Sequence, residues 1–259
     1  MISELPCPPE DAPTVIEKDG VLSLHFGFPT IQSQALLADP ARLVLDYTRT
    51  MMGFLLFQPK PKSIAMIGLG GGSLAKYCHH KLPGADFTAV ELSAAVIALR
   101  TEFGIPDDSE RFRVVCDDGA RYLRKQIDAF DVLLIDGFDR SGQPEQLCSV
   151  RFYDDCRASL CANGILAINL CADDPACDSY LSRIDTAFSG RMLVVNADEG
   201  ENKIVFAGKS ENFLPSFGVL AERLRTLEPS HAVDLDLTAQ KLMRGGPLQT
   251  KRRRSKPHR

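Results

Sequence analysis

Long apolar runs are absent from this sequence. None reaches the roughly 18 residues that a helix needs to cross a bilayer. The first residues also lack the basic region followed by an apolar core that marks a secretory signal. We therefore expect no membrane partner and a cytoplasmic location.

Paired cysteines are absent as well. The chain has eight cysteines, but no two of them form a C-x-x-C pair, the spacing that is typical of zinc sites and redox motifs. Without a secretory signal, isolated cysteines are expected to be free thiols that are buried or incidental. We predict no bound metal.

Outside one basic segment, acidic residues outnumber basic ones. The formal net charge is −4, yet the last nine residues carry six Lys or Arg, so the rest of the chain (−4 minus 6) is at about −10. An acidic body raises the local concentration of cations and favours a cationic substrate. The basic segment is the only feature that would favour nucleic acid, and we expect a solvated tail rather than a nucleic-acid partner.

Composition and pattern divide the chain into four segments. Asp19-Gly20 lies between two short apolar runs and predicts a β-hairpin, because a type I′ turn needs positive φ at both positions. Asp39-Pro40 predicts the start of a helix that runs to about Phe57. The segments are a disordered N-terminus at 1–12, a small β-hairpin region plus helix at 13–57, a Rossmann-like catalytic domain at 58–245 and a basic disordered tail at 246–259.

The third segment alternates predicted strands with predicted helices. Its last two strands, Met192–Val195 and Lys203–Ala207, are joined by a segment too short for a crossover helix, so they should pair antiparallel. That ending is typical of the S-adenosylmethionine-dependent methyltransferase-type Rossmann sheet, whereas dinucleotide dehydrogenases continue with parallel crossovers. We predict an α/β fold of this type. The earlier strands are expected at 63–68, 86–91, 111–116, 131–136 and 164–170, and the helices at about 73–81, 93–103, 119–128, 150–160 and 175–188.

A nucleoside site is predicted at the carboxyl edge of this sheet. The first strand leads into a glycine-rich turn, where side chains would block the approach of a ligand to the backbone. Glu91 ends the second strand and can hold two ribose hydroxyls, and Asp118 follows the third and can accept from an adenine amino group. The residues predicted to bind the nucleoside in this region are Gly68, Gly70, Gly71, Gly72, Glu91, Asp118 and Gly119.

A loop after the fourth strand carries two further carboxylates. Asp136 and Asp139 lie three residues apart in a segment rich in Gly, Ser and Pro. Carboxylates placed against a cationic amine can hold it and remove the proton that blocks its attack on carbon. We therefore interpret this segment as a loop that closes over the site, with an amine as the acceptor.

These motifs together resemble the spermidine and spermine synthases, aminopropyltransferases that use decarboxylated S-adenosylmethionine. The resemblance covers about residues 30 to 170. Its motifs are Tyr47 before Met51-Met52, Pro59-Lys-Pro-Lys62 before the glycine-rich turn, Val90-Glu91, Arg111-Phe-Arg-Val114 before Asp118-Gly119, Asp136-Gly-Phe-Asp139, Pro144, Leu147 and Phe152-Tyr153.

The resemblance implies roles for several residues. Asp136 would be the base that acts on the attacking amine, and Asp139 would anchor the acceptor polyamine. Tyr47 would line the acceptor pocket and assist Asp136. Gln32 is similar to a glutamine that contacts the donor in the family. The family also suggests a homodimer.

One position departs from the family pattern. In the spermidine synthases an acid within the glycine-rich turn binds the ammonium of the donor, and Gly71 occupies that place here. A charge-assisted contact of this kind contributes about 1.5–3 kcal/mol, so its loss could invert the preference between the decarboxylated donor and ordinary S-adenosylmethionine.

Two alternative functions stay open at this stage. A methyltransferase that uses S-adenosylmethionine on an amine or another small molecule would share the fold, and Gly71 favours it. A non-catalytic module that binds a nucleoside or a polyamine would share the acids, although binding alone does not require Asp136. The sequence does not identify the accepted amine, the oligomeric state or the role of the basic tail.

Overall fold

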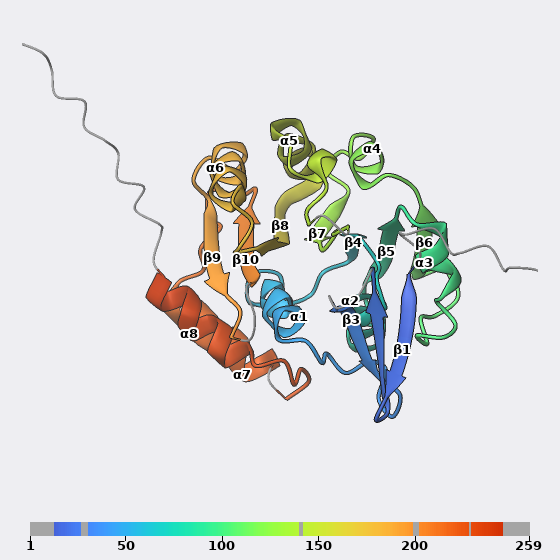
Figure 1. The fold of residues 1–259 in the computed structure, drawn as a ribbon. Coiled ribbons are helices and arrows are strands. Elements are labelled where there is room, and N and C mark those ends of the chain that lie inside the picture. The colour runs from blue at the N-terminus through green and yellow to red at the C-terminus, as the bar shows by residue number, and fades with distance from the viewer. Residues whose placement is uncertain (1–12, 27–30, 140–141, 199–201, 228, 246–259) are drawn as a thin grey trace, which may run out of the picture.

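The chain folds into a small and a large β-sheet with helices around the larger one (Figure 1). The structure is a computed structural model. The predicted disordered segments at 1–12 and 246–259 lie outside the residues that it describes. The described residues are 13–26, 31–139, 142–198, 202–227 and 229–245.

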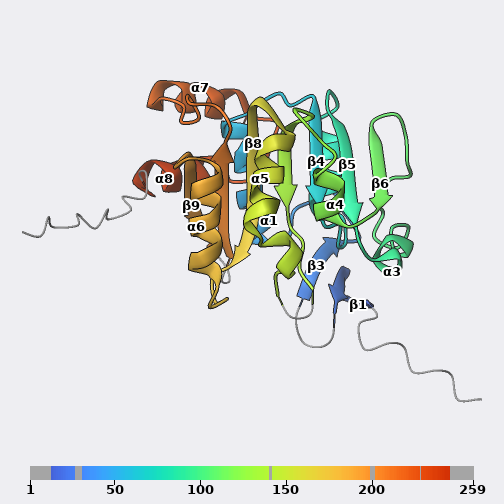
Figure 2. The same ribbon diagram turned by 90° about the horizontal axis from the view of Figure 1, so that it is seen from above.

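The small sheet is antiparallel, with its three strands in the order β1 (Thr14–Lys18), β2 (Val21–His25) and β3 (Ile31–Leu36). Asp19 and Gly20 join the first two strands with φ of 52° and 77°, so the predicted hairpin is confirmed. Figure 2 shows this sheet beyond one edge of the larger sheet.

The large sheet has seven strands in the order β6-β5-β4-β7-β8-β10-β9. The pairs among the first five are parallel, and β10 is antiparallel to both β8 and β9. The predicted methyltransferase-type sheet with a terminal antiparallel hairpin is therefore confirmed. The strands are β4 (Ser63–Ile67), β5 (Asp86–Glu91), β6 (Phe112–Cys116), β7 (Phe130–Ile135), β8 (Leu160–Cys171), β9 (Met192–Asn196) and β10 (Asn202–Gly208).

Helices cover both faces of this sheet. One face carries α4, α5 and α6, which lie toward the viewer in Figure 2, and the other carries α1, α2, α7 and α8. The helices are α1 (Asp46–Met51), α2 (Ser73–Lys81), α3 (Ala94–Ala98), α4 (Gly119–Leu123), α5 (Val150–Ser159), α6 (Cys177–Ala187), α7 (Phe217–Leu227) and α8 (Leu235–Gly245), with short 3-10 helices at Met52–Leu56 and Glu145–Leu147.

Strand β4 shows why its sequence is apolar throughout. Ile64 and Met66 pack into the core beneath α1 and α2, whereas Ala65 and Ile67 pack into the core beneath α4 and α5. All four are almost completely buried. A strand covered on both faces has no solvent side, so its sequence does not alternate between apolar and polar residues.

The helix predicted from Asp39-Pro40 begins later than the sequence indicates. It starts at Asp46, after Leu45, whose backbone is extended with φ of −76° and ψ of 132°. Arg49 donates to the carbonyl oxygens of Leu43 and Val44, at 3.3 and 2.7 Å. The Asp46 carboxylate accepts from the backbone N–H of Asp198 in the distant β9–β10 connection. These contacts link positions far apart in the chain, which local sequence patterns do not reveal.

Helices α7 and α8 were not predicted. They pack against the 3-10 helix at Met52–Leu56 and against β9. Within the described residues, no helix is long enough and apolar enough to span a membrane. The seven cysteines in this part of the chain are free, as predicted.

Candidate active site

A cavity of about 460 Å³ opens at the carboxyl edge of the parallel strands. The glycine-rich turn that follows β4 forms part of its wall. Gly68 has φ of +91°, and a Cβ atom at this position would lie 2.2 Å from the carbonyl oxygen of Asp136. Only glycine fits this backbone conformation and this close approach, so the turn brings β4 and the loop after β7 together.

Glu91 is fixed at one side of the cavity by two backbone groups. Its Oε2 atom accepts from the N–H of Leu69 at 2.8 Å, and its Oε1 atom accepts from the N–H of Ser93 at 2.8 Å. A carboxylate oxygen has more than one acceptor site, so both oxygens can also receive ligand hydroxyl groups. The glycine-rich turn thus positions the residue predicted to hold ribose.

Asp118 lies on the same side, at the start of α4. Its side chain caps this helix, because Oδ1 accepts from the N–H of Arg121 at 2.7 Å. Next to it, Gly119 allows the helix to approach β4 closely, since a Cβ atom there would lie 2.3 Å from Cγ2 of Ile67. Both Asp118 and Gly119 line the cavity, and their role in binding the donor stays a prediction.

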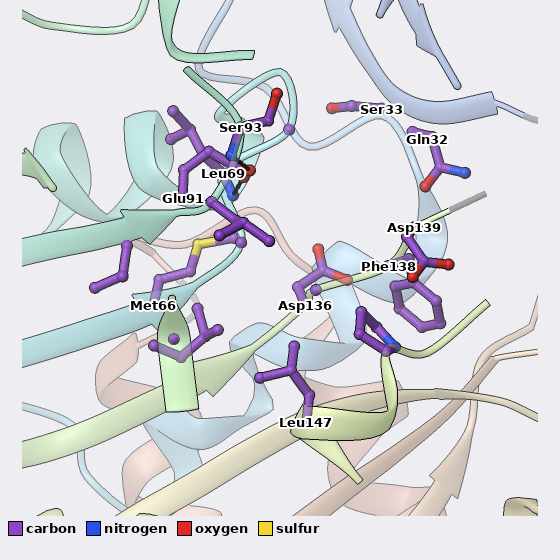
Figure 3. A pocket seen from close by; sticks show the side chains of 18 of the residues that line it. Gln32, Ser33, Met66, Leu69, Glu91, Ser93, Asp136, Phe138, Asp139 and Leu147 are labelled. Carbon is purple, nitrogen blue, oxygen red and sulfur yellow. Dashed lines mark hydrogen bonds between the residues drawn. The ribbon is translucent and has the colours of Figure 1, made fainter. Parts of the chain in front are cut away.

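Asp136 follows β7 and lies between the two sides of the cavity (Figure 3). Tyr47 donates through its hydroxyl to Oδ2 of Asp136 at 3.2 Å, and Asn169 donates through Nδ2 to Oδ1 at 2.9 Å. Asn169 in turn accepts from Nδ2 of Asn202 at 2.9 Å. The carboxylate is therefore held in one orientation by groups from α1 and β8.

The two titratable groups of this cluster have shifted pKa values. Burial raises the pKa of the Asp136 carboxyl, and the hydrogen bonds from Asn169 and Tyr47 partly oppose that shift. Burial and the neighbouring Asp136 carboxylate raise the pKa of Tyr47 well above its ordinary value. A carboxylate with a raised pKa is a stronger base, which suits proton transfer from an amine.

The opposite side of the cavity is formed by the N-terminal sheet and by the loop after β7. Figure 3 shows Gln32, Phe138 and Asp139 together there, across Asp136 from Glu91, Leu69 and Ser93. Asp139 is exposed, and its backbone pairs with Gly142 across a short turn. Beyond Asp136, this part of the cavity thus offers a second carboxylate to a ligand.

Most predicted site residues line this one cavity, but two do not. Gly71 and Gly72, the last two glycines of the glycine-rich turn, are buried away from the cavity. A Cβ atom at Gly72 would lie 2.5 Å from Ile105, and one at Gly71 would lie 2.8 Å from both Phe103 and Oγ of Ser33. Their assignment to the donor site stays a prediction. The predicted residues that line the cavity are Gln32, Tyr47, Gly68, Gly70, Glu91, Asp118, Gly119, Asp136 and Asp139.

The packing at Gly71 predicts that an acid is not tolerated there. We expect Gly71→Asp to lower the free energy of unfolding by about 1–3 kcal/mol, because the buried Phe103 ring must move to admit the new side chain. Gly84→Asp is the matched control, since only the end of Lys62 lies within 4 Å of a Cβ atom at Gly84. Urea denaturation of both variants measures the difference. Equal stability, with tighter binding of the decarboxylated donor by Gly71→Asp, would contradict this packing.

Sequence reasoning missed the two asparagines behind Asp136. Asn169 is a polar residue within the apolar run of β8 and is only 2% exposed. A buried polar side chain needs a hydrogen-bond partner, so its presence in this strand was a usable signal. Asn202 gave no such signal, because its partner depends on the pairing of β8 with β10. Among the described residues, no cluster of His, Cys, Asp or Glu has the arrangement of a metal site.

The chain is similar to known proteins over most of its length. The family model for the spermine/spermidine synthase domain matches residues 45–183. The chain is 37% identical over 215 residues to a polyamine aminopropyltransferase of Chromobacterium violaceum, covering 83% of this chain and 82% of that protein. It is 36% identical over 222 residues to a polyamine aminopropyltransferase of Neisseria meningitidis, covering 85% and 84%.

A solved structure of another protein shares the fold of this chain. A crystal structure of a probable spermidine synthase from Corynebacterium glutamicum matches with a TM-score of 0.70. The match covers 91% of each chain at 19% sequence identity. At this identity the likeness shows a shared fold.

Proposed function

The chain belongs to the spermine/spermidine synthase family. From that premise we propose that the protein transfers an aminopropyl group from decarboxylated S-adenosylmethionine to an amine of a polyamine, with both substrates bound in this cavity. The observation that carries this proposal is the partly buried Asp136 carboxylate, which lies between two hydrogen-bond donors in a cavity that Glu91, Asp118 and Asp139 also line.

The reaction asks the protein to align two cations and to remove one proton. The deprotonated amine attacks the methylene carbon next to the sulfonium sulfur. A C–N bond forms, the C–S bond breaks, and its electron pair stays on sulfur to give a neutral thioether nucleoside. Asp136 takes the proton that the amine loses. Alignment of the reacting atoms can supply about 7–11 kcal/mol of the barrier reduction, more than the roughly 3–5 kcal/mol of a general base, so positioning contributes at least as much as proton removal.

The carboxylates of the cavity favour the decarboxylated donor. Glu91 and Asp118 hold the nucleoside at one side, and Asp136 and Asp139 hold the amine at the other. A decarboxylated donor carries two positive charges and no negative charge. Ordinary S-adenosylmethionine adds a carboxylate, which these four acids repel. This repulsion provides donor selection although Gly71 replaces the acid of the family.

The acceptor is a polyamine whose attacking nitrogen lies at Asp136 and whose more distant ammonium lies at Asp139. Tyr47 lines this part of the cavity and donates to Asp136, so it orients the base. Gln32 from β3 lies beside Asp139, on the amine side of the cavity, so its contact with the donor stays a prediction. The homodimer and the cytoplasmic location stay predictions.

Mass spectrometry of the products tests the proposal. The purified protein is incubated with 1,4-diaminobutane and either decarboxylated or ordinary S-adenosylmethionine. We expect an N-aminopropylated amine and 5′-methylthioadenosine with the first donor, and no methylated amine with the second. Methylated amine would instead favour the methyltransferase alternative. Absence of both products across a panel of diamines and polyamines would favour a binding module.

A further inference from the structure

Two asparagines extend the hydrogen bonding of Asp136 across two strands of the large sheet. Asn169 on β8 donates to Oδ1 of Asp136 at 2.9 Å, and Asn202 at the start of β10 donates to Oδ1 of Asn169 at 2.9 Å. Asn169 is almost fully buried, and Asn202 is partly exposed. The chemistry of the proposed reaction requires neither residue to touch a substrate.

The direction of these hydrogen bonds follows from the chemistry of an amide. One end of the Asn169 side chain donates, and the other accepts. Because Nδ2 of Asn202 occupies the accepting end, the donating end of Asn169 must face Asp136. With the amide turned over, its oxygen would face a carboxylate oxygen and repel it. The hydrogen bond from Asn202 is therefore compatible only with the orientation of Asn169 that stabilises the ionised form of Asp136.

We propose that Asn202 is a positioning residue, which acts through Asn169 to keep the Asp136 carboxylate ionised and in place for proton removal from the acceptor amine. This inference rests on the proposed function, because it assigns the base of that reaction a partner. It is consistent with the opposing effects at Asp136, where burial raises the pKa and the hydrogen bond from Asn169 lowers it.

Other charged groups around Asp136 bear on its titration. Tyr47 contacts it from α1, and its hydrogen bond also favours the ionised carboxyl. Glu91 from β5, Asp118 before α4 and Asp139 on its own loop line the same cavity, and each negative charge favours the protonated form. On β10, Lys203 follows Asn202 but lies near Sγ of Cys177, at 4.0 Å.

Asn202→Asp tests the proposal with a side chain of the same shape. The new carboxylate only accepts, so the amide of Asn169 is expected to turn its donating end toward it and its oxygen toward Asp136. Asp136 then gains a proton more readily. We expect the midpoint of the acid limb in the pH profile of kcat/KM to rise by about one pH unit. At pH values below this midpoint, kcat/KM should fall roughly tenfold, and at alkaline pH it should return to the wild-type value. The assay uses decarboxylated S-adenosylmethionine and 1,4-diaminobutane.

Asn196→Asp is the matched control. It adds the same charge to the same hairpin from an exposed position at the end of β9, and it should leave the profile unchanged. If Asn202→Asp also leaves the profile unchanged, or if both variants move it equally, the proposal is overturned.

A second readout separates this inference from the proposed function. The protonated carboxyl stretch of Asp136 can be titrated by infrared difference spectroscopy, with Asp136→Asn identifying the band. We expect the midpoint to rise in Asn202→Asp relative to the wild type, even where no substrate has been added. An unchanged midpoint contradicts the inference. A shifted midpoint in a protein that makes no product supports it while contradicting the proposed function.

Discussion

Asp136→Asn is expected to lower kcat for aminopropyl transfer by about 10²–10⁴-fold, the usual contribution of a positioned general base. The amide keeps the size of the side chain and can still accept from Tyr47, so the cavity should keep its shape. It cannot take the proton of the acceptor amine. Steady-state kinetics at saturating donor and amine measure the loss, and calorimetric titration should give donor affinity close to that of the wild type.

Asp173→Asn is the control for the loss of one negative charge. Asp173 is an exposed residue in the loop after β8, at the same edge of the sheet. Its replacement should leave kcat within a factor of about two, because exposed charges are screened by water and salt. Full turnover in Asp136→Asn would show that this residue is not the base. Equal losses of kcat in both variants would show that the negative electrostatic potential of the cavity, rather than proton removal by Asp136, supports the reaction.

Gly68→Ala is expected to damage both the fold and the reaction. Alanine at φ of +91° is strained, and its Cβ atom would lie 2.2 Å from the carbonyl oxygen of Asp136. The loop that carries the base must move to relieve this contact. A displacement of about 1 Å at a reacting group can lower a rate by about 100-fold, so we expect kcat to fall by at least about that factor. Steady-state kinetics and urea denaturation measure the two effects.

Gly190→Ala separates the backbone strain from the steric clash. Gly190 has φ of +78°, with no atom within 4 Å of a Cβ atom at that position. Its replacement should lower the free energy of unfolding by about 1–2 kcal/mol and leave kcat unchanged. The clash in Gly68→Ala should add about 1–3 kcal/mol more. Equal stability and full activity in the two variants would contradict the contact between Gly68 and Asp136.

The acids of the site could be predicted from the sequence because their positions follow from a general property of parallel sheets. Glu91, Asp118 and Asp136 follow strands that run in the same direction, so the carboxyl ends of these strands meet at one edge. This prediction needs only the common direction of the strands and not their order in the sheet. The terminal hairpin was equally accessible, since the connection before β10 is too short for a crossover helix.

The remaining features depend on contacts between distant parts of the chain. The side chain of Asn169 accepts a hydrogen bond from Asn202. The space beside Gly71 is filled by the ring of Phe103, which follows α3. The Asp46 carboxylate, in the first turn of α1, accepts from the backbone N–H of Asp198. In each case the partner is more than 30 residues away, so neither periodicity nor turn signals could indicate it.

A crystal structure with 5′-methylthioadenosine and 1,4-diaminobutane would show whether the nucleoside and the amine bind side by side in this cavity. We expect the ribose hydroxyls on the Glu91 carboxylate and one amine nitrogen within hydrogen-bond distance of Asp136. A nucleoside bound away from Glu91, or an amine that does not reach Asp136, would contradict this expectation.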